Sequence, residues 1–260
     1  MIKTHIIYIP FTGVGTNKVL SPEWLADRIE IFKSYTLKSL LNQTNREFFL
    51  WLTFRPDEKD NPLVDELAEY MSHIEGLRFQ FTFDGLMYHD DRNPEQNEIL
   101  LERMEKSLAV LLGLGVDGDW FYLTRIDSDD MFHRDVVQLI QDQEPFEGAL
   151  TLQLGYVYNK DTGEVAEWNP LTNPPFHTVM MQRETFYDPI RHRLAFGLFT
   201  SHEDIAQLKH KVLWRNKNRR DRLYMVLTHN PSMHISTTWD HEFKGKAIET
   251  PYTTISEFGI

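Results

Sequence analysis

The chain has 260 residues, of which 41% are hydrophobic and 13% aromatic, and its formal net charge is −12. This composition can build a sizeable core and excludes a largely disordered chain. The absence of cysteine excludes disulfides, a cysteine-ligated zinc and a thiol nucleophile. The acidic balance disfavours a protein that coats nucleic acid. No segment has the apolar length of a membrane helix, so we expect a soluble, cytoplasmic protein.

The first half of the chain alternates strand-like with helix-like stretches. Residues 5–9 form a short apolar strand that ends at Pro10. Ser21 and Pro22 begin a helical pattern that continues to about residue 42, because a serine N-cap followed by proline favours a helix start. Further helices are expected at 61–73 and 95–112, and further strands at 48–54, 77–83 and 120–124. This order predicts an α/β fold with a mainly parallel, doubly wound sheet.

The second half follows a different pattern. A short helix at 136–140 precedes strand-like stretches at 149–154, 155–158 and 177–181, and a hairpin turn is expected at 160–163. These elements predict a mixed or antiparallel extension of the sheet. We treat residues 1–260 as one domain with two lobes, at 1–140 and 141–260.

Three carboxylates follow the strand at 120–124, in the stretch YLTRIDSDDMF. They are Asp127, Asp129 and Asp130. Ligands of parallel α/β sheets bind beyond the carboxyl ends of the strands, where this cluster falls. Two carboxylates at i and i+2 can hold Mn²⁺ or Mg²⁺ together with substrate phosphates. The alternative is structural: Asp130 caps the next helix and the other acids solvate a turn.

Four features resemble GT-A fold glycosyltransferases of the small bacterial inverting kind. They are the strand HIIYIPF, the helix YTLKSLLNQT before FFLWLTF, the motif RIDSDD, and SHED at residues 201–204. The segment GYVYNKDTGEVAEWNPLTNPPFHT is also similar to rhamnosyltransferase family proteins. The resemblance implies a GT-A-like (Rossmann-like) fold with a DxD motif, in which residues 1–140 would be the nucleotide-sugar-binding lobe and residues 141–260 the acceptor lobe. It also implies an enzyme of polysaccharide biosynthesis that moves a sugar, rhamnose by this likeness, from a nucleoside-diphosphate donor to a hydroxyl of a glycan.

The resemblance assigns roles to the acids and histidines. Asp127 would meet the donor ribose or the metal, and Asp129 the metal and through it the diphosphate. Asp204 would be the base that takes the acceptor's proton, supported by Glu203, although acids also favour any helix N-terminus. His234, with His229 as its competitor, would complete the metal shell.

The nucleotide is expected against the loops that follow the first three strands. The residues assigned to it by position are Pro10, Phe11, Thr12, Arg55, Asp57, Asp84 and Arg92. Asp57 or Asp84 would accept from the base, and Arg92 would reach a phosphate unless it is only a surface residue.

A basic stretch at 209–222 stands out in this acidic chain. It would hold phosphates, or contact an anionic membrane that carries a lipid-linked acceptor, or simply form a solvated helix face or loop. Trp168, expected in a proline-rich loop, would stack on a sugar or pack ordinarily.

Two other functions compete with glycosyl transfer. A nucleotidyltransferase would place a glycine-rich, basic loop after the first strand, whereas residues 12–16 are followed only by Lys18. A non-catalytic glycan- or nucleotide-binding module would bind its ligand without turnover.

Overall fold

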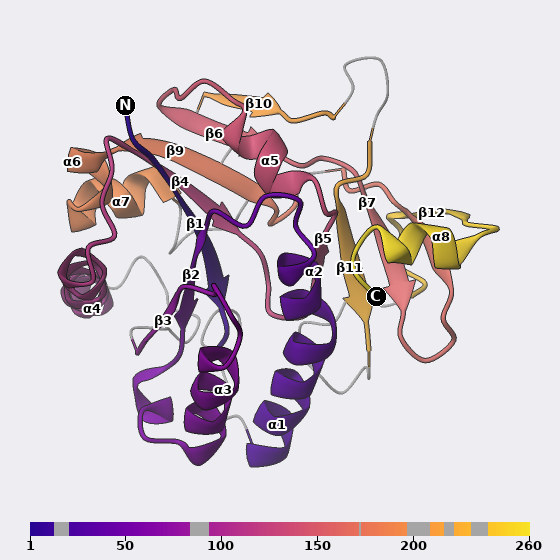
Figure 1. The fold of residues 1–260 in the computed structure, drawn as a ribbon, viewed down its shortest axis with the longest axis horizontal. Helices are drawn as coiled ribbons and strands as arrows, with labels where there is room; N and C mark the ends of the chain where they lie inside the picture. The colour runs from indigo at the N-terminus through magenta and orange to yellow at the C-terminus, as the bar shows by residue number, and fades with distance from the viewer. Residues whose placement is uncertain (13–20, 84–93, 172, 197–208, 216–220, 230–238) are drawn as a thin grey trace.

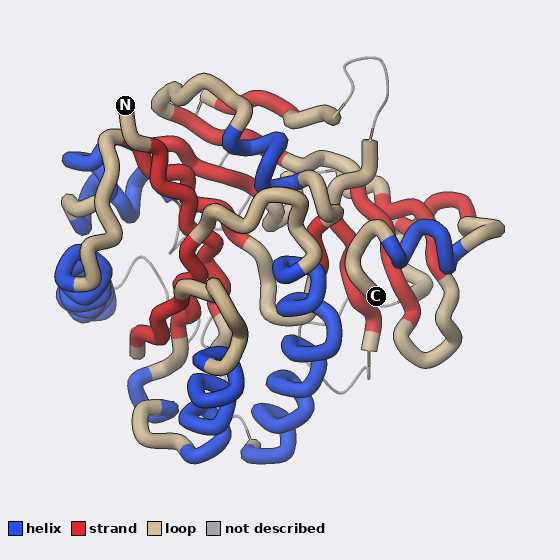
Figure 2. The backbone as a smooth tube through the Cα atoms, in the orientation of Figure 1, coloured by secondary structure: helices blue, strands red, loops and turns tan. Residues whose placement is uncertain are grey.

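The computed structural model describes residues 1–12, 21–83, 94–171, 173–196, 209–215, 221–229 and 239–260 (Figure 1). These residues build two β-sheets with helices packed around the larger one, as the tube in Figure 2 makes clear. The large sheet has seven strands in the order β10-β6-β9-β4-β1-β2-β3, and the small sheet has five in the order β12-β8-β7-β11-β5. The large sheet therefore takes strands from both expected lobes, 1–140 and 141–260.

Four neighbouring strands of the large sheet are parallel, as the alternating pattern predicted. They are β3 (Phe79–Thr82), β2 (Phe49–Thr53), β1 (Lys3–Pro10) and β4 (Trp120–Arg125). Beyond β4 the direction reverses in β9 (His177–Gln182), reverses again in β6 (Gly148–Thr151), and β10 (His210–Val212) closes the edge parallel to β6. The chain leaves β1 toward β2 on one side and returns from β3 to β4 on the other, so the switch point of the sheet lies between β1 and β4.

Helices cover both faces of the large sheet. One face carries α1 (Pro22–Ile31), the π-helical segment η1 (Phe32–Thr36), α2 (Leu37–Leu41), α3 (Pro62–Ser72) and α5 (Val136–Gln141). The other carries α4 (Pro94–Gly113) and α6 (Arg183–Phe186), and α7 (Pro189–Phe196) packs beside them. Adjacent residues of one strand serve opposite faces: Ile7 joins the first cluster and Ile6 the second. The predicted double coverage is confirmed.

Local signals explain where the helices begin. Ser21 accepts a hydrogen bond from the Trp24 N–H at 3.2 Å, and Asn61 accepts from the Leu63 N–H at 3.1 Å. Each cap precedes a proline at the first helical position. A short 3-10 turn, η2 (Pro56–Glu58), links β2 to α3. Among the described residues, no helix is both long and apolar enough to cross a bilayer.

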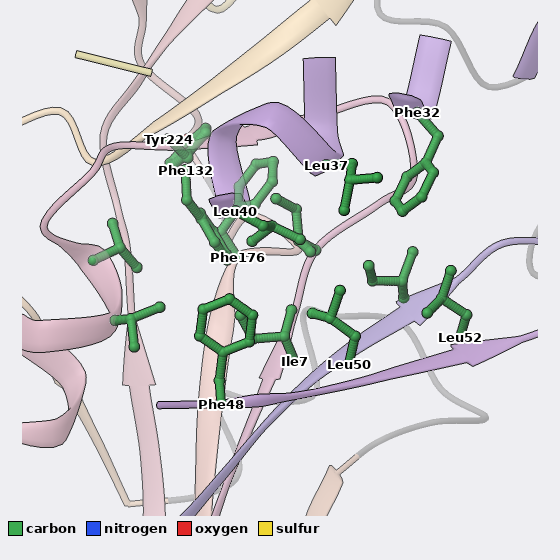
Figure 3. Packing of buried hydrophobic residues seen from close by; sticks show 14 of the residues in the cluster. Ile7, Phe32, Leu37, Leu40, Phe48, Leu50, Leu52, Phe132, Phe176 and Tyr224 are labelled. Carbon is green, nitrogen blue, oxygen red and sulfur yellow. The ribbon is translucent and has the colours of Figure 1, made fainter. Parts of the chain in front are cut away.

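The larger core continues from the large sheet into the small one. In Figure 3, Phe32, Leu37 and Leu40 of the helical layer lie opposite Ile7 and Leu50 of the strands. The same cluster reaches Phe132, Phe176 and Tyr224, all fully or almost fully buried. Burial of this apolar surface joins the two sheets into a single packed body.

The predicted mixed extension divides between the two sheets: β6 and β9 join the large sheet, and β7 lies in the small one. The small sheet comprises β12 (Lys244–Ala247), β8 (Val165–Trp168), β7 (Gly155–Asn159), β11 (Tyr224–Thr228) and β5 (Met131–Phe132), and α8 (Pro251–Ser256) follows it. The expected loop position of Trp168 is wrong, because this residue ends β8, is only 5% exposed and packs edge-on against Phe243.

Candidate active site

The acid motif lies between the two sheets, beyond the carboxyl end of β4. The Asp130 N–H donates to the Asp127 carbonyl at 3.3 Å, which closes a tight turn. β5 begins directly afterwards and pairs with β11 in the small sheet. The motif therefore bridges the large and the small sheet next to the switch point, where ligands of such sheets bind.

Asp129 is held by two basic side chains from distant parts of the chain. Its Oδ2 lies 2.5 Å from Nη1 of Arg28 on α1 and 2.9 Å from Nε2 of His229, which directly follows β11. All three residues are at most 9% exposed. The structure thus brings together Asp129 and one of the two histidines named from the sequence, and adds an arginine that was not.

Asp130 has a different environment one residue later. It is 6% exposed, and its Oδ1 accepts the Leu227 N–H of β11 at 3.2 Å. It does not cap the following helix: Asp135 occupies the N-cap position of α5. The capping alternative for Asp130 is therefore wrong, because the pairing of β5 with β11 turns this carboxylate toward the small sheet.

The pKa values of the two buried carboxyls are shifted in opposite directions. Burial raises the pKa of Asp129, but the Arg28 charge and the His229 hydrogen bond outweigh it, so the net shift is downward and the carboxylate is ionised. Burial raises the pKa of Asp130 well above its usual range, and the charges of Asp129 and Asp127 add to the rise. The motif thus favours the ionised form of Asp129 more strongly than that of Asp130.

Asp127 is the more accessible acid of the motif. Its side chain is 29% exposed, and its Oδ1 lies 3.1 Å from Nη2 of Arg125, the last residue of β4. This contact leaves the other carboxylate oxygen of Asp127 for an incoming group.

The chemistry of these donors fits a hard divalent cation. Carboxylate oxygens suit Mn²⁺ and Mg²⁺. Nδ1 of His229 is buried and has no hydrogen-bond partner among the described residues, whereas Nε2 meets Asp129 and would have to give up that contact to bind the same ion as Asp129. In the described part of the chain, however, no three His, Asp or Glu side chains already converge as a metal cluster.

The described residues among those expected to meet the nucleotide lie together at the ends of β1 and β2. Arg55 is 3% exposed, and its Nη2 lies 2.9 Å from Glu58 Oε1, while the Asp57 side chain is 70% exposed. The Thr12 hydroxyl accepts the Arg55 N–H at 2.9 Å.

Phe11 stacks on Phe54 with the ring centroids 4.8 Å apart, so its side chain belongs to the core. Pro10 pairs with Thr53 at the end of the parallel ladder.

Several predicted site residues lie outside the described residues. They are Asp84, Arg92, Glu203, Asp204 and His234.

The basic stretch is partly described, and its described residues, 209–215 and 221–222, are not helical. Its first residues form the edge strand β10, and Nζ of Lys211 lies 4.3 Å from the centroid of the Phe146 ring. Arg222 at its end donates to the carbonyls of Gly155 and Trp168, at 2.7 and 3.0 Å. Arg222 therefore ties strands of the small sheet together.

Three residues of this region were missed from the sequence: Arg28, Arg125 and Glu58. Arg28 had a readable signal, because it shares the apolar stripe of α1 with Leu25 and Ile29. A charged residue in such a stripe needs a buried partner, and the acid motif contains one. The other two gave no comparable signal.

The fold and the acid motif agree with a glycosyltransferase, and the family match establishes that class. The chain belongs to the family described as "Putative rhamnosyl transferase", whose model matches residues 16–168 of the 260. No curated protein matches the chain.

Two solved structures share parts of the arrangement at low similarity. One is 4-diphosphocytidyl-2C-methyl-D-erythritol synthase, with 10% identity and a TM-score of 0.41, covering 89% of this chain and 95% of that one. The other is a nucleotide-diphospho-sugar transferase, described as putative, from Desulfovibrio desulfuricans G20, with 14% identity and a TM-score of 0.35, covering 82% of this chain and 80% of that one.

Proposed function

We propose that this glycosyltransferase is metal-dependent and inverting. It moves a sugar, rhamnose by family, from a nucleoside-diphosphate donor to a hydroxyl of a glycan or lipid-linked acceptor, on the cytoplasmic side of the membrane. The observation that carries the proposal is the ionised, buried Asp129 beside His229 at the switch point of a parallel sheet.

The proposal gives each described acid a separate task. Asp129 and His229 would hold Mn²⁺ or Mg²⁺, and Asp127, the exposed acid, would contact the ion or the donor ribose. The ion, when bound, would stabilise negative charge on the departing nucleoside diphosphate. Arg125 holds the Asp127 carboxylate in place, and Arg28 does the same for Asp129.

The remaining tasks fall mostly to residues outside the described part of the chain, with Asp57 the exception. Asp204, supported by Glu203, is proposed as the base for the acceptor hydroxyl, and His234 stays an alternative metal ligand. Asp57, Asp84 and Arg92 are proposed contacts of the base and phosphates.

Turnover with a panel of UDP-, dTDP- and GDP-sugars tests the proposal. Wild type is expected to release nucleoside diphosphate with Mn²⁺ or Mg²⁺ and to stop when the ion is chelated. Asp129→Asn should lower kcat by about a hundredfold or more, because the ion's charge on the leaving group is lost. Asp65→Asn, on the exposed side of α3, is the matched control and should leave kcat unchanged.

Two results would overturn the proposal. One is an Asp129→Asn variant with wild-type turnover and wild-type cation dependence. The other is release of pyrophosphate from a nucleoside triphosphate in place of sugar transfer, which would indicate a nucleotidyltransferase.

A further inference from the structure

A buried cation already sits at the acid motif. Arg28 is 5% exposed, its Nη1 lies 2.5 Å from Asp129 Oδ2, and its guanidinium carbon lies 5.1 Å from the centroid of the Trp24 ring. Its Nε is buried without a hydrogen-bond partner among the described residues. The guanidinium is therefore anchored by one ion pair and one aromatic face.

Stability alone does not account for an arginine at this position. A buried ion pair often contributes no more than well-packed apolar residues of the same size. The neighbours of Arg28 on the inner side of α1, Leu25 and Ile29, are apolar and continue the core. An apolar residue here would extend that stripe and would leave no unpaired Nε. The arginine thus points to a task at Asp129.

The contact with Asp129 has an electrostatic consequence for any ion that binds there. Arg28 and His229 both approach Oδ2, so a divalent cation meets a carboxylate whose charge is already offset. It also meets the repulsion of a guanidinium in a setting with little water to screen it. A nucleoside diphosphate brings negative charge that compensates for both the ion and Arg28.

We propose that Arg28 makes divalent-cation binding at Asp129 depend on the nucleoside diphosphate. Arg28 is a positioning residue: it keeps Asp129 in place before the donor arrives and weakens the binding of a cation alone. When the donor binds, the negative charge of its diphosphate stabilises the cation and the Arg28 guanidinium beside each other. This inference rests on the proposed function and deepens it, because it assigns the order in which the ligands bind.

Mn²⁺ titrations followed by electron paramagnetic resonance or calorimetry test the inference without any turnover. Arg28→Gln removes the charge, and we expect it to bind Mn²⁺ alone about tenfold more tightly than wild type. Arg28→Lys keeps the charge and should bind Mn²⁺ as weakly as wild type. Saturating UDP, dTDP or GDP should strengthen Mn²⁺ binding to wild type more than to Arg28→Gln.

A second uncharged variant guards against a folding defect. Arg28→Met keeps the length and packing of the side chain, and circular dichroism checks that each variant is folded. If neither Arg28→Gln nor Arg28→Met binds Mn²⁺ alone more tightly than wild type and Arg28→Lys, the inference is wrong.

Asp129→Asn separates this failure from a failure of the proposed function. If Asp129→Asn weakens Mn²⁺ binding but Arg28→Gln and Arg28→Met do not strengthen it, only the proposed role of Arg28 is wrong. If Asp129→Asn leaves Mn²⁺ binding unchanged, the metal site itself is wrong, and the inference falls with it.

Discussion

The ion pair between Arg55 and Glu58 ties down the chain at the carboxyl end of β2. The two side chains are 3% and 7% exposed, and Glu58 Oε2 also accepts from the Asn61 side chain at 2.8 Å. Glu58→Ala would leave a buried guanidinium without its closest acid. We expect the free energy of unfolding to fall by about 3 kcal/mol, measured by urea denaturation.

Asp57 supplies the matched control for this pair. Its carboxylate is also near Arg55, at 3.7 Å, but its side chain is 70% exposed. Asp57→Ala should therefore change the free energy of unfolding by less than about 0.5 kcal/mol. Equal losses in the two variants would contradict the assignment of Glu58 as the stabilising partner. A folded Asp57→Ala variant with weaker nucleotide binding would support the proposed contact of Asp57 with the base.

Single residues of the site were predictable to different degrees. The acids of RIDSDD were found because three carboxylates after a buried strand have few structural explanations. Of the two partners of Asp129, His229 was named only through the family resemblance, as the competitor of His234, and Arg28 was missed, because the two lie 100 positions later and 101 positions earlier in the chain. Such contacts arise from tertiary packing, which local patterns do not encode.

At the scale of elements, β7 and β11 approach each other closely at one glycine. A Cβ built on Gly155 would lie 2.3 to 2.6 Å from ring atoms of Tyr224. That ring is fully buried and stacks on Phe176 with the centroids 3.9 Å apart, so moving it would disturb the core and cost free energy. Gly155→Ala should lower the free energy of unfolding by about 2 kcal/mol in urea denaturation.

A second glycine controls for the general effect of adding a methyl group. Gly113 ends α4, and a Cβ there would meet no atom within 4 Å. Gly113→Ala should be neutral or slightly stabilising, because alanine restricts the unfolded chain and favours the helix. A Gly155→Ala variant as stable as Gly113→Ala would show that Tyr224 can shift.

The elements that were predicted correctly are those with strong local patterns. β1, β2, β3 and β4 and their connecting helices are each marked by apolar runs, caps and prolines. β5, with two residues, and β10, with three, are too short to carry a pattern. The antiparallel position of β9 between β4 and β6 depends on pairing across the chain, which no local signal determines.

For the whole molecule, the acid motif depends on both sheets. β4 presents the motif from the large sheet, whereas Leu227 and His229 of the small sheet bind Asp130 and Asp129. The continuous core that includes Tyr224 and Phe132 (Figure 3) fixes the position of these two sets of residues relative to each other. A substitution that disrupts the small sheet is therefore expected to displace Asp129 and Asp130 even where no residue of the site is itself replaced.

Two buried histidines make the folded molecule sensitive to acid. Burial lowers the pKa of His5 to about 3 and that of His192 to about 4, from an ordinary value of 6.5. Both are neutral when folded, and below pH 6.5 the unfolded chain binds protons that the folded chain does not. Stability is thus fully present above about pH 6.5 and falls as the pH drops toward the folded-state values.

Removing one histidine should make that loss of stability less steep. In His192→Leu, the slope of the free energy of unfolding between pH 6 and pH 5 should fall by about 1 kcal/mol per pH unit, because one proton no longer separates the two states. Urea denaturation at several pH values measures the slope independently of the cost of losing the hydrogen bond to the Phe186 carbonyl. An unchanged slope in His192→Leu would mean that this histidine takes up its proton without unfolding the chain.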